Sequence, residues 1–300
     1  MSSRWRLAGC AVAVLLLAGC STTGGDSRDG QQPTGSTTTT APKVDRGLIA
    51  FEQGVFGEDE RLVFFDPATE KVTPVPGGER GYYARFSEDG SMLVWSRLRE
   101  DREGTDGVMV HDLRTGKTRK IQEEGGGCPA FAPDGRSVVT SSAERIDLDS
   151  GKIDPLPGPK EGCRIELEDG RFLYTHHDDK IQLIDGDKIG TIYRAPGCRL
   201  DTASISHEGS NVAFIRRCKA TDDFGVTVMG IDGSKPQSAV KGNCYGTGWS
   251  PDGKSMVSAC VDAGETAASL WVFDLAGSAQ PEKVQPSPVN TPTWGTRAPD

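Results

Sequence analysis

The residues best suited to chemistry are six cysteines between positions 128 and 260. Thiols can oxidise to disulfides, or they can bind a metal ion as thiolates. Metal-binding cysteines usually occur in CxxC or CxxH pairs, and neither spacing occurs among these six. Their even number favours a disulfide framework. We therefore expect disulfides from Cys128, Cys163, Cys198, Cys218, Cys244 and Cys260.

The four histidines do not indicate a catalytic centre. His207 lies in an expected turn, and His111 lies near the end of an expected strand. Residues 176–179 read His-His-Asp-Asp, which could bind a metal, but they fall in a loop between two expected strands, where polar side chains are usual. We interpret them as a turn. No GxSxG motif is present, and no catalytic residue is predicted.

The first 20 residues have the layout of an export signal. Arg4 and Arg6 precede an apolar run, residues 7–18, that is too short to span a membrane. Residues 17–20, Leu-Ala-Gly-Cys, resemble the lipobox of bacterial lipoproteins; the alternative is an ordinary signal peptide with a chance cysteine. The resemblance implies cleavage before Cys20 and attachment of diacylglycerol, with a further acyl chain such as palmitate on the new amine. Two or three chains anchor a protein stably. An earlier Leu-Ala-Gly-Cys, ending at Cys10, has no apolar run before it.

The segment after the lipobox is expected to be a tether. Residues 21–46 are Ser, Thr, Gly, Gln, Asp and Pro with almost nothing apolar, so they cannot form a core. As a flexible coil they would span about 28 Å. The expected organisation is therefore a signal peptide at 1–19, a lipidated tether at 20–46 and a folded domain at 47–300. Removing Arg4 and Arg6 changes the net charge from −9 to −11, which argues against nucleic acid as a partner.

The domain contains a repeat with a period typical of propeller blades. Phe86-SEDG, Phe131-APDG, Ile205-SHEG and Trp249-SPDG each place an acid and a glycine before an apolar strand. Weaker copies begin at Glu166 and Trp294, so the lead residues are 45, 35, 39, 44 and 45 positions apart. Asp-Gly between alternating strands is a strong hairpin signal. A second strand pair follows each hairpin, and four strands per repeat are typical of a β-propeller.

Six lead residues predict six blades. The N-terminal stretch supplies three strands, within residues 48–53, 61–67 and 70–75, and residues 291–295 supply one inner strand with nothing after it. Joined, they make one blade, so the C-terminal strand is expected to close the ring and leave no open edge there. The aromatic leads at 86, 131, 249 and 294 are expected to pack between blades, and the aspartates of the turns to act as turn formers.

The repeats resemble the WD-like propeller repeats of TolB and its relatives, and the SPDGK hairpin at residues 250–254 is the most specific part. The resemblance covers nearly the whole domain and implies the fold, whereas proteins with this repeat differ in function. TolB has an α/β domain before its propeller and this chain has only a linker, so a role in the Tol–Pal system is doubtful.

The hairpins predict how the cysteines pair. The residue numbers of two residues that face each other across a hairpin add up to a constant, and half of that sum is the centre of the turn. Positions 198 and 218 are centred on Glu208, and positions 244 and 260 are centred on Asp252. Both centres predict a three-residue loop that places Cys198 opposite Cys218 and Cys244 opposite Cys260. Opposed strand residues lie within disulfide range. By elimination Cys128 pairs with Cys163, since each lies seven residues before its turn glycine on adjacent blades.

Two functions are consistent with these features. The first is a lipid-anchored module on the outer side of the cell membrane that binds a protein, a peptide or another ligand such as an envelope polymer, without a cofactor. Ser21 after the lipidated cysteine favours the outer membrane where a cell has two. The alternative is an enzyme of lactonase or hydrolase type with a channel calcium ion, for which Glu166, Asp201 and Asn243 are the candidate ligands. Glu166 is explained equally well by a one-residue register shift that turns Ile165 and Leu167 inward.

Overall fold

A computed structural model describes residues 47–54, 60–101, 103–276, 281–285 and 289–296. The predicted signal peptide, the lipid attachment residue Cys20 and the tether lie outside this part of the chain. Within it, no helix is long and apolar enough to cross a membrane.

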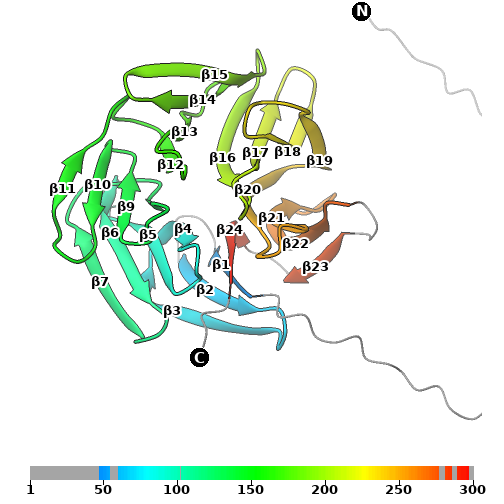
Figure 1. The fold of residues 1–300 in the computed structure, drawn as a ribbon. Helices are drawn as coiled ribbons and strands as arrows, with labels where there is room; N and C mark the ends of the chain where they lie inside the picture. The colour runs from blue at the N-terminus through cyan, green and yellow to red at the C-terminus, as the bar shows by residue number, and fades with distance from the viewer. Residues whose placement is uncertain (1–46, 55–59, 102, 277–280, 286–288, 297–300) are drawn as a thin grey trace, which may run out of the picture. The chain divides into compact units, whose positions relative to one another are not determined.

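The described chain forms six sheets of four antiparallel strands each, arranged in a ring (Figure 1). Blade 1 consists of β24 (Val289–Gly295), β1 (Leu48–Gln53), β2 (Arg61–Asp66) and β3 (Lys71–Glu79). Blade 2 consists of β4 (Gly81–Phe86), β5 (Met92–Leu98), β6 (Thr105–Asp112) and β7 (Lys117–Gln122). Blade 3 consists of β8 (Ala130–Phe131), β9 (Ser137–Thr140), β10 (Glu144–Asp147) and β11 (Ile153–Pro155).

The second half of the ring repeats this order. Blade 4 consists of β12 (Cys163–Glu166), β13 (Phe172–Thr175), β14 (Lys180–Asp185) and β15 (Lys188–Arg194). Blade 5 consists of β16 (Arg199–Ile205), β17 (Asn211–Cys218), β18 (Asp223–Gly230) and β19 (Gln237–Lys241). Blade 6 consists of β20 (Cys244–Trp249), β21 (Ser255–Val261), β22 (Ala268–Asp274) and β23 (Glu282–Gln285). The predicted six blades, and closure by β24 against β1, are confirmed.

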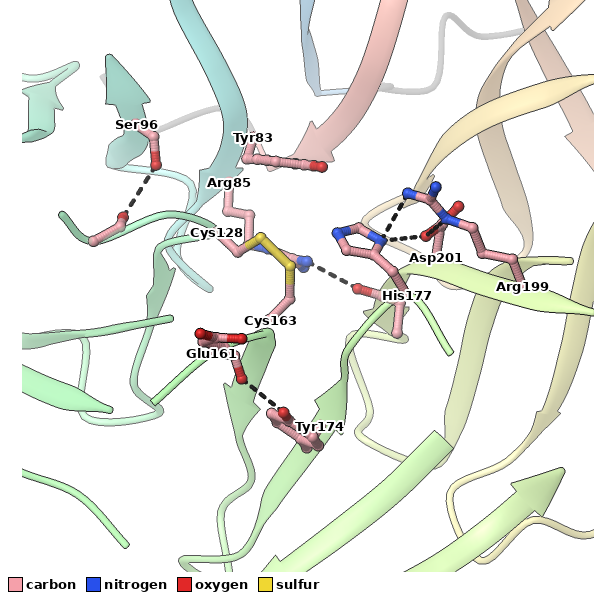
Figure 2. Close-up of a disulfide and its surroundings, with 12 residues drawn as sticks. Tyr83, Arg85, Ser96, Cys128, Glu161, Cys163, Tyr174, His177, Arg199 and Asp201 are labelled. Carbon is pink, nitrogen blue, oxygen red and sulfur yellow. Dashed lines mark hydrogen bonds and ion pairs between the residues drawn. A yellow bond between two sulfur atoms is a disulfide. The ribbon is translucent and has the colours of Figure 1, made fainter. Parts of the chain in front are cut away.

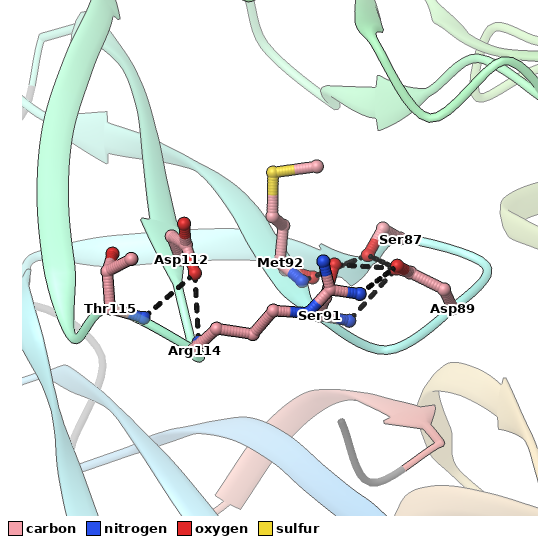
Figure 3. Close-up of polar contacts among 7 residues, drawn as sticks. All are labelled: Ser87, Asp89, Ser91, Met92, Asp112, Arg114 and Thr115. Carbon is pink, nitrogen blue, oxygen red and sulfur yellow. Dashed lines mark hydrogen bonds and ion pairs between the residues drawn. The ribbon is translucent and has the colours of Figure 1, made fainter. Parts of the chain in front are cut away.

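The repeated acid forms the turn between the first two strands of a blade. In blade 2 the Asp89 carboxylate accepts hydrogen bonds from the Ser87 hydroxyl at 2.7 Å and the Ser91 amide at 3.0 Å, and Arg114 binds it at 2.8 Å (Figure 3). Gly90 has a φ of +68°, and a Cβ there would lie 2.1 Å from the Thr296 carbonyl oxygen. The turn therefore needs both the acid and the glycine, as the sequence predicted.

The lead aromatic residues pack between neighbouring blades, as predicted. The ring centroid of Phe86 in blade 2 lies 6.2 Å from that of Phe64 in blade 1. Trp249 of blade 6 packs in a buried cluster that includes Ile215 and Val228 of blade 5. Because each blade buries one face against the next, the ring is held together by successive cores rather than by one central core.

The hairpin geometry differs from the prediction by one residue. Between Ser206 and Asn211 the loop has four residues, not three. The inner strand compensates with a bulge, because two residues of β16, Thr202 and Ala203, lie opposite one residue of β17. The residue numbers of paired residues therefore add up to 417 near the turn and to 416 beyond the bulge, where Arg199 faces Arg217. The extra turn residue and the extra strand residue cancel, so the cysteine positions predicted from the shorter turn still face each other.

Candidate functional site

The inner strands of five blades have the same backbone irregularity where they line the channel. The residue three positions before each lead residue has a positive φ, and all but one of these residues carry a side chain: Tyr83, Cys128, Thr202, Gly246 and Thr291. In four of these strands a register shift marks a β-bulge. Positive φ is costly for residues other than glycine, and such residues cluster at functional sites. The repeated bulge makes the channel the candidate site.

All three disulfides lie at the same end of the inner strands, which we name the disulfide end. The structure pairs Cys128 with Cys163, Cys198 with Cys218 and Cys244 with Cys260, as the sequence predicted. The first joins blades 3 and 4, and the others each join the two innermost strands of one blade. The Cα–Cα distances are 5.2, 4.1 and 4.0 Å, respectively. Cross-links at one end hold the inner strands in place around that end of the channel.

A buried carboxylate joins the closing strand to the next blade. Glu52 on β1 is 7% exposed and accepts hydrogen bonds from the Tyr83 amide of blade 2 at 3.0 Å and from the Thr291 hydroxyl of β24. Burial raises the pKa of Glu52 to about 7, with a further increase from Glu60, although both hydrogen bonds lower it. Glu52 thus holds two of the bulge residues, and its charge changes near neutral pH.

A second polar cluster lies between blades 4 and 5. His177, in the loop after β13, has a φ of +50° and its Nδ1 is hydrogen-bonded to Asp201 of β16 (Figure 2). Arg199 donates through Nε to the same carboxylate at 2.9 Å. Burial opposes ionisation of Asp201, but the hydrogen bonds and charges of His177 and Arg199 outweigh it and lower its pKa. The positive φ of His177 thus brings its exposed imidazole against Asp201 of the next blade.

Tyr83 donates its amide to Glu52, and its hydroxyl is influenced by the charges of both clusters. Burial raises the pKa of its hydroxyl; the charges of Glu52 and Asp201 raise it further, and those of Arg199 and Arg217 lower it. Arg217 lies 4.5 Å above the ring of Tyr245, an arrangement that favours a cation over an aromatic face. The disulfide end therefore combines tyrosine rings with charges of both signs.

Arg85 on β4 reaches across the channel. Its Nη2 donates to the carbonyl oxygen of Ala203 on β16 at 2.8 Å, and blades 2 and 5 are opposite members of a ring of six (Figures 1 and 2). Burial lowers the pKa of Arg85 to about 10, against a small opposing effect of Tyr83. A cavity of about 420 Å³ adjoins Arg85 and is lined by residues from the inner strands of all six blades. This volume is in the range of small-ligand sites.

The three predicted cation ligands do not come together. Glu166 pairs with Arg145 of blade 3, so it takes the interblade position that the aromatic leads occupy elsewhere. Asn243 is exposed and donates to the Tyr245 hydroxyl at 3.0 Å. Only Asp201 belongs to the channel cluster. Among the described residues no group of three or more His, Cys, Asp or Glu could hold a metal ion.

The interpretation of residues 176–179 as a turn is right for the backbone but incomplete for His177. Glu52, Tyr83 and Arg85 are functional-site residues that were not predicted from the sequence. A signal for Arg85 was present: the residue just before each lead residue is Arg85, Ala130, Ile165, Ser204, Gly248 or Thr293, so Arg85 is the one charged member of that set. Glu52 had no such signal, because it lies on the second strand of its blade.

Comparisons with known proteins define the class by structure alone. No protein-family model matches the sequence, and no curated protein matches it. TolB from Acinetobacter baumannii superposes with a TM-score of 0.70 at 18% identity, covering 85% of this chain and 68% of that one. An oligogalacturonate lyase in complex with manganese gives 0.55 at 18% identity, covering 80% and 74%, and the Vibrio parahaemolyticus oligogalacturonate lyase gives 0.52 at 15%, covering 78% of each chain. The chain thus has a TolB-like six-bladed β-propeller fold.

Proposed function

We propose that this protein is a lipid-anchored binding module of the cell envelope whose channel receives a segment of a partner polypeptide. The observation that carries the proposal is the channel itself: a cavity of about 420 Å³ beside Arg85, framed by bulged inner strands whose disulfide end has three cross-links. Preorganised polar groups of this kind suit recognition. The disulfides favour an oxidising compartment outside the cytoplasm, in agreement with the export signal.

Cross-linking from the channel tests the binding role. A photoactivatable residue in place of Glu168, an exposed residue that lines the cavity, should capture a specific protein from native membranes. The same residue in place of Lys117, an exposed position on the outer strand β7, is the matched control and should not capture it. Equal labelling from both positions would contradict a channel site. Calcium in the purified protein together with a chelator-sensitive hydrolase activity would favour the enzymatic alternative.

The anchor is tested by a single substitution. Cys20→Ser removes the thiol that would carry the lipid, so the protein should move from the membrane pellet to the soluble fraction on cell fractionation. Cys10→Ser makes the same change in the earlier Leu-Ala-Gly-Cys and should leave the protein in the pellet. A Cys20→Ser protein that stays in the membrane fraction would refute the lipoprotein assignment.

A further inference from the structure

Arg85 has a positive charge without a negative partner. Among the residues that the structure describes, its polar contact is the neutral carbonyl of Ala203, and no carboxylate lies within ion-pair distance. Arg164 differs from the partly buried Arg85, because it donates to two carbonyl oxygens of its own preceding loop and is enclosed by protein. Arg85 instead lines a cavity. A guanidinium has five N–H donors, so most of the binding capacity of Arg85 is open to a ligand.

The other inner strands carry no charge at the repeat position that Arg85 occupies. The residues at the equivalent position of the other inner strands are Ala130, Ile165, Ser204, Gly248 and Thr293, all uncharged and all lining the same cavity. The Thr202 hydroxyl, which also lines the cavity, is buried without a hydrogen-bond partner. A charge removed from water without a partner is costly, and an anion from outside would relieve that cost.

The pattern of charge favours one carboxylate rather than many. The arginines that line the cavity are Arg85 and Arg171, and Arg171 is already paired with Asp169, so Arg85 is the lining arginine with capacity left for a ligand. At the end away from the disulfides, where the first hairpin turn of each blade lies, the cavity is also lined by Glu88, Glu168 and Glu208. A polyanion such as an oligouronide would bring further carboxylates beside these and beside Asp201. A peptide with a single carboxylate avoids that repulsion.

We infer that Arg85 binds a carboxylate of the peptide segment that the channel receives, exchanging the Ala203 carbonyl for two carboxylate oxygens. Bidentate pairing of this kind is the strongest geometry open to a guanidinium. The Arg85–Ala203 hydrogen bond spans the channel, so a carboxylate that replaces the carbonyl lies inside the cavity between blades 2 and 5. The inference rests on the proposed function and adds the chemistry of the ligand to it.

Calorimetric titration of the detergent-solubilised protein with matched peptides tests this inference. Acetyl-Gly-Gly-Ala with a free terminal carboxylate should bind at least about tenfold more tightly than its terminal amide. Acetyl-Gly-Asp-Gly-amide carries the carboxylate on a side chain, so it distinguishes the two sources of that group. Digalacturonate is the polyanionic comparison and should bind more weakly than the better peptide.

Arg85→Gln should abolish the difference between the acid and the amide. Arg119→Gln is the matched control, because Arg119 also donates to a carbonyl of the next blade, that of Leu148 at 2.6 Å, but lies on β7 outside the cavity. If Arg85→Gln folds poorly by circular dichroism, Arg85→Lys keeps the charge, loses the bidentate fork and should weaken the acid several-fold.

Three outcomes would overturn the inference. These are equal binding of acid and amide by the unmodified protein, a preference that survives in Arg85→Gln, and no binding of any carboxylate at ~10 mM, beyond the millimolar range of weak sites. Tighter binding of digalacturonate would keep the anion site but refute the peptide ligand. A partner captured by cross-linking whose binding ignores Arg85 would leave the proposed function standing and refute this inference alone.

Discussion

Glu52→Gln is expected to stabilise the folded domain by about 3 kcal/mol at pH 8 and to have little effect at pH 4.5. Burial raises the pKa of Glu52 from 4.5 to about 7. A shift of that size corresponds to about 3 kcal/mol between the two protonation states. Glutamine keeps the Oε1 atom that accepts from Tyr83 and Thr291, so the substitution removes the charge and preserves both hydrogen bonds.

The direction of the change in stability with pH follows from the folded state, which binds the proton of Glu52 more tightly than the unfolded state does. With a folded pKa above the unfolded one, the stability associated with Glu52 is fully present below pH 4.5 and is lost as the pH rises through 7. The Gln variant has no such loss. Urea denaturation of both proteins at pH 4.5, 6, 7 and 8 should therefore give curves that diverge as the pH rises.

A solvated carboxylate serves as the control for this measurement. Glu100 lies exposed in the turn after β5, so Glu100→Gln should differ from the unmodified protein by the same small amount at every pH. If the difference caused by Glu52→Gln does not change between pH 4.5 and pH 8, Glu52 is not the buried acid that the structure places at the ring closure.

The six blades and their order could be predicted from the sequence because each repeat contains its own local signals. The turn acid, the turn glycine and the alternating strands act within about 15 residues, so positions such as Asp89 and Gly90 can be interpreted without knowledge of the rest of the chain. Closure of the ring was also predictable, since three N-terminal strands and one C-terminal strand are together one blade. The pairing of the six cysteines was predictable from the same repeat, through the centres of the hairpins and the equivalent positions of Cys128 and Cys163.

The channel was harder to predict, because its chemistry depends on contacts between blades. Glu52 meets Tyr83 and Thr291 only once the ring is closed, and the last pair is 239 residues apart in sequence. His177 reaches Asp201 because its residue adopts positive φ, which no local motif indicates. In the hairpins centred near Glu208 and Asp252 the bulges were hidden because both turns are one residue longer than predicted and offset them. Long-range polar contacts and bulges leave weak traces in a single sequence.

A positive φ and the interblade disulfide coincide at one position of the repeat, Cys128. Cys128 has a positive φ, whereas Cys163, its equivalent in blade 4, lies in a regular register with β13. Blade 3 also has the shortest inner strand, since β8 comprises two residues. Few ladder hydrogen bonds therefore hold this strand, and the disulfide supplies a link to the neighbouring blade.

Replacing both cysteines with alanine, Cys128→Ala with Cys163→Ala, is accordingly expected to destabilise the domain by about 4 kcal/mol. The cross-linked positions are 35 residues apart, and a loop of that length loses about this much chain entropy when closed in the unfolded state. For a domain of this size the midpoint of thermal unfolding should fall by roughly 10 °C.

The Cys198–Cys218 and Cys244–Cys260 pairs close loops of 20 and 16 residues, so removing either should cost less, about 3 kcal/mol. Non-reducing peptide mapping of the unmodified protein establishes that the bonds are present before the comparison. A midpoint unchanged by loss of the Cys128–Cys163 pair would show that β8 is held by strand pairing and packing alone, and that the cross-link does not stabilise the channel wall.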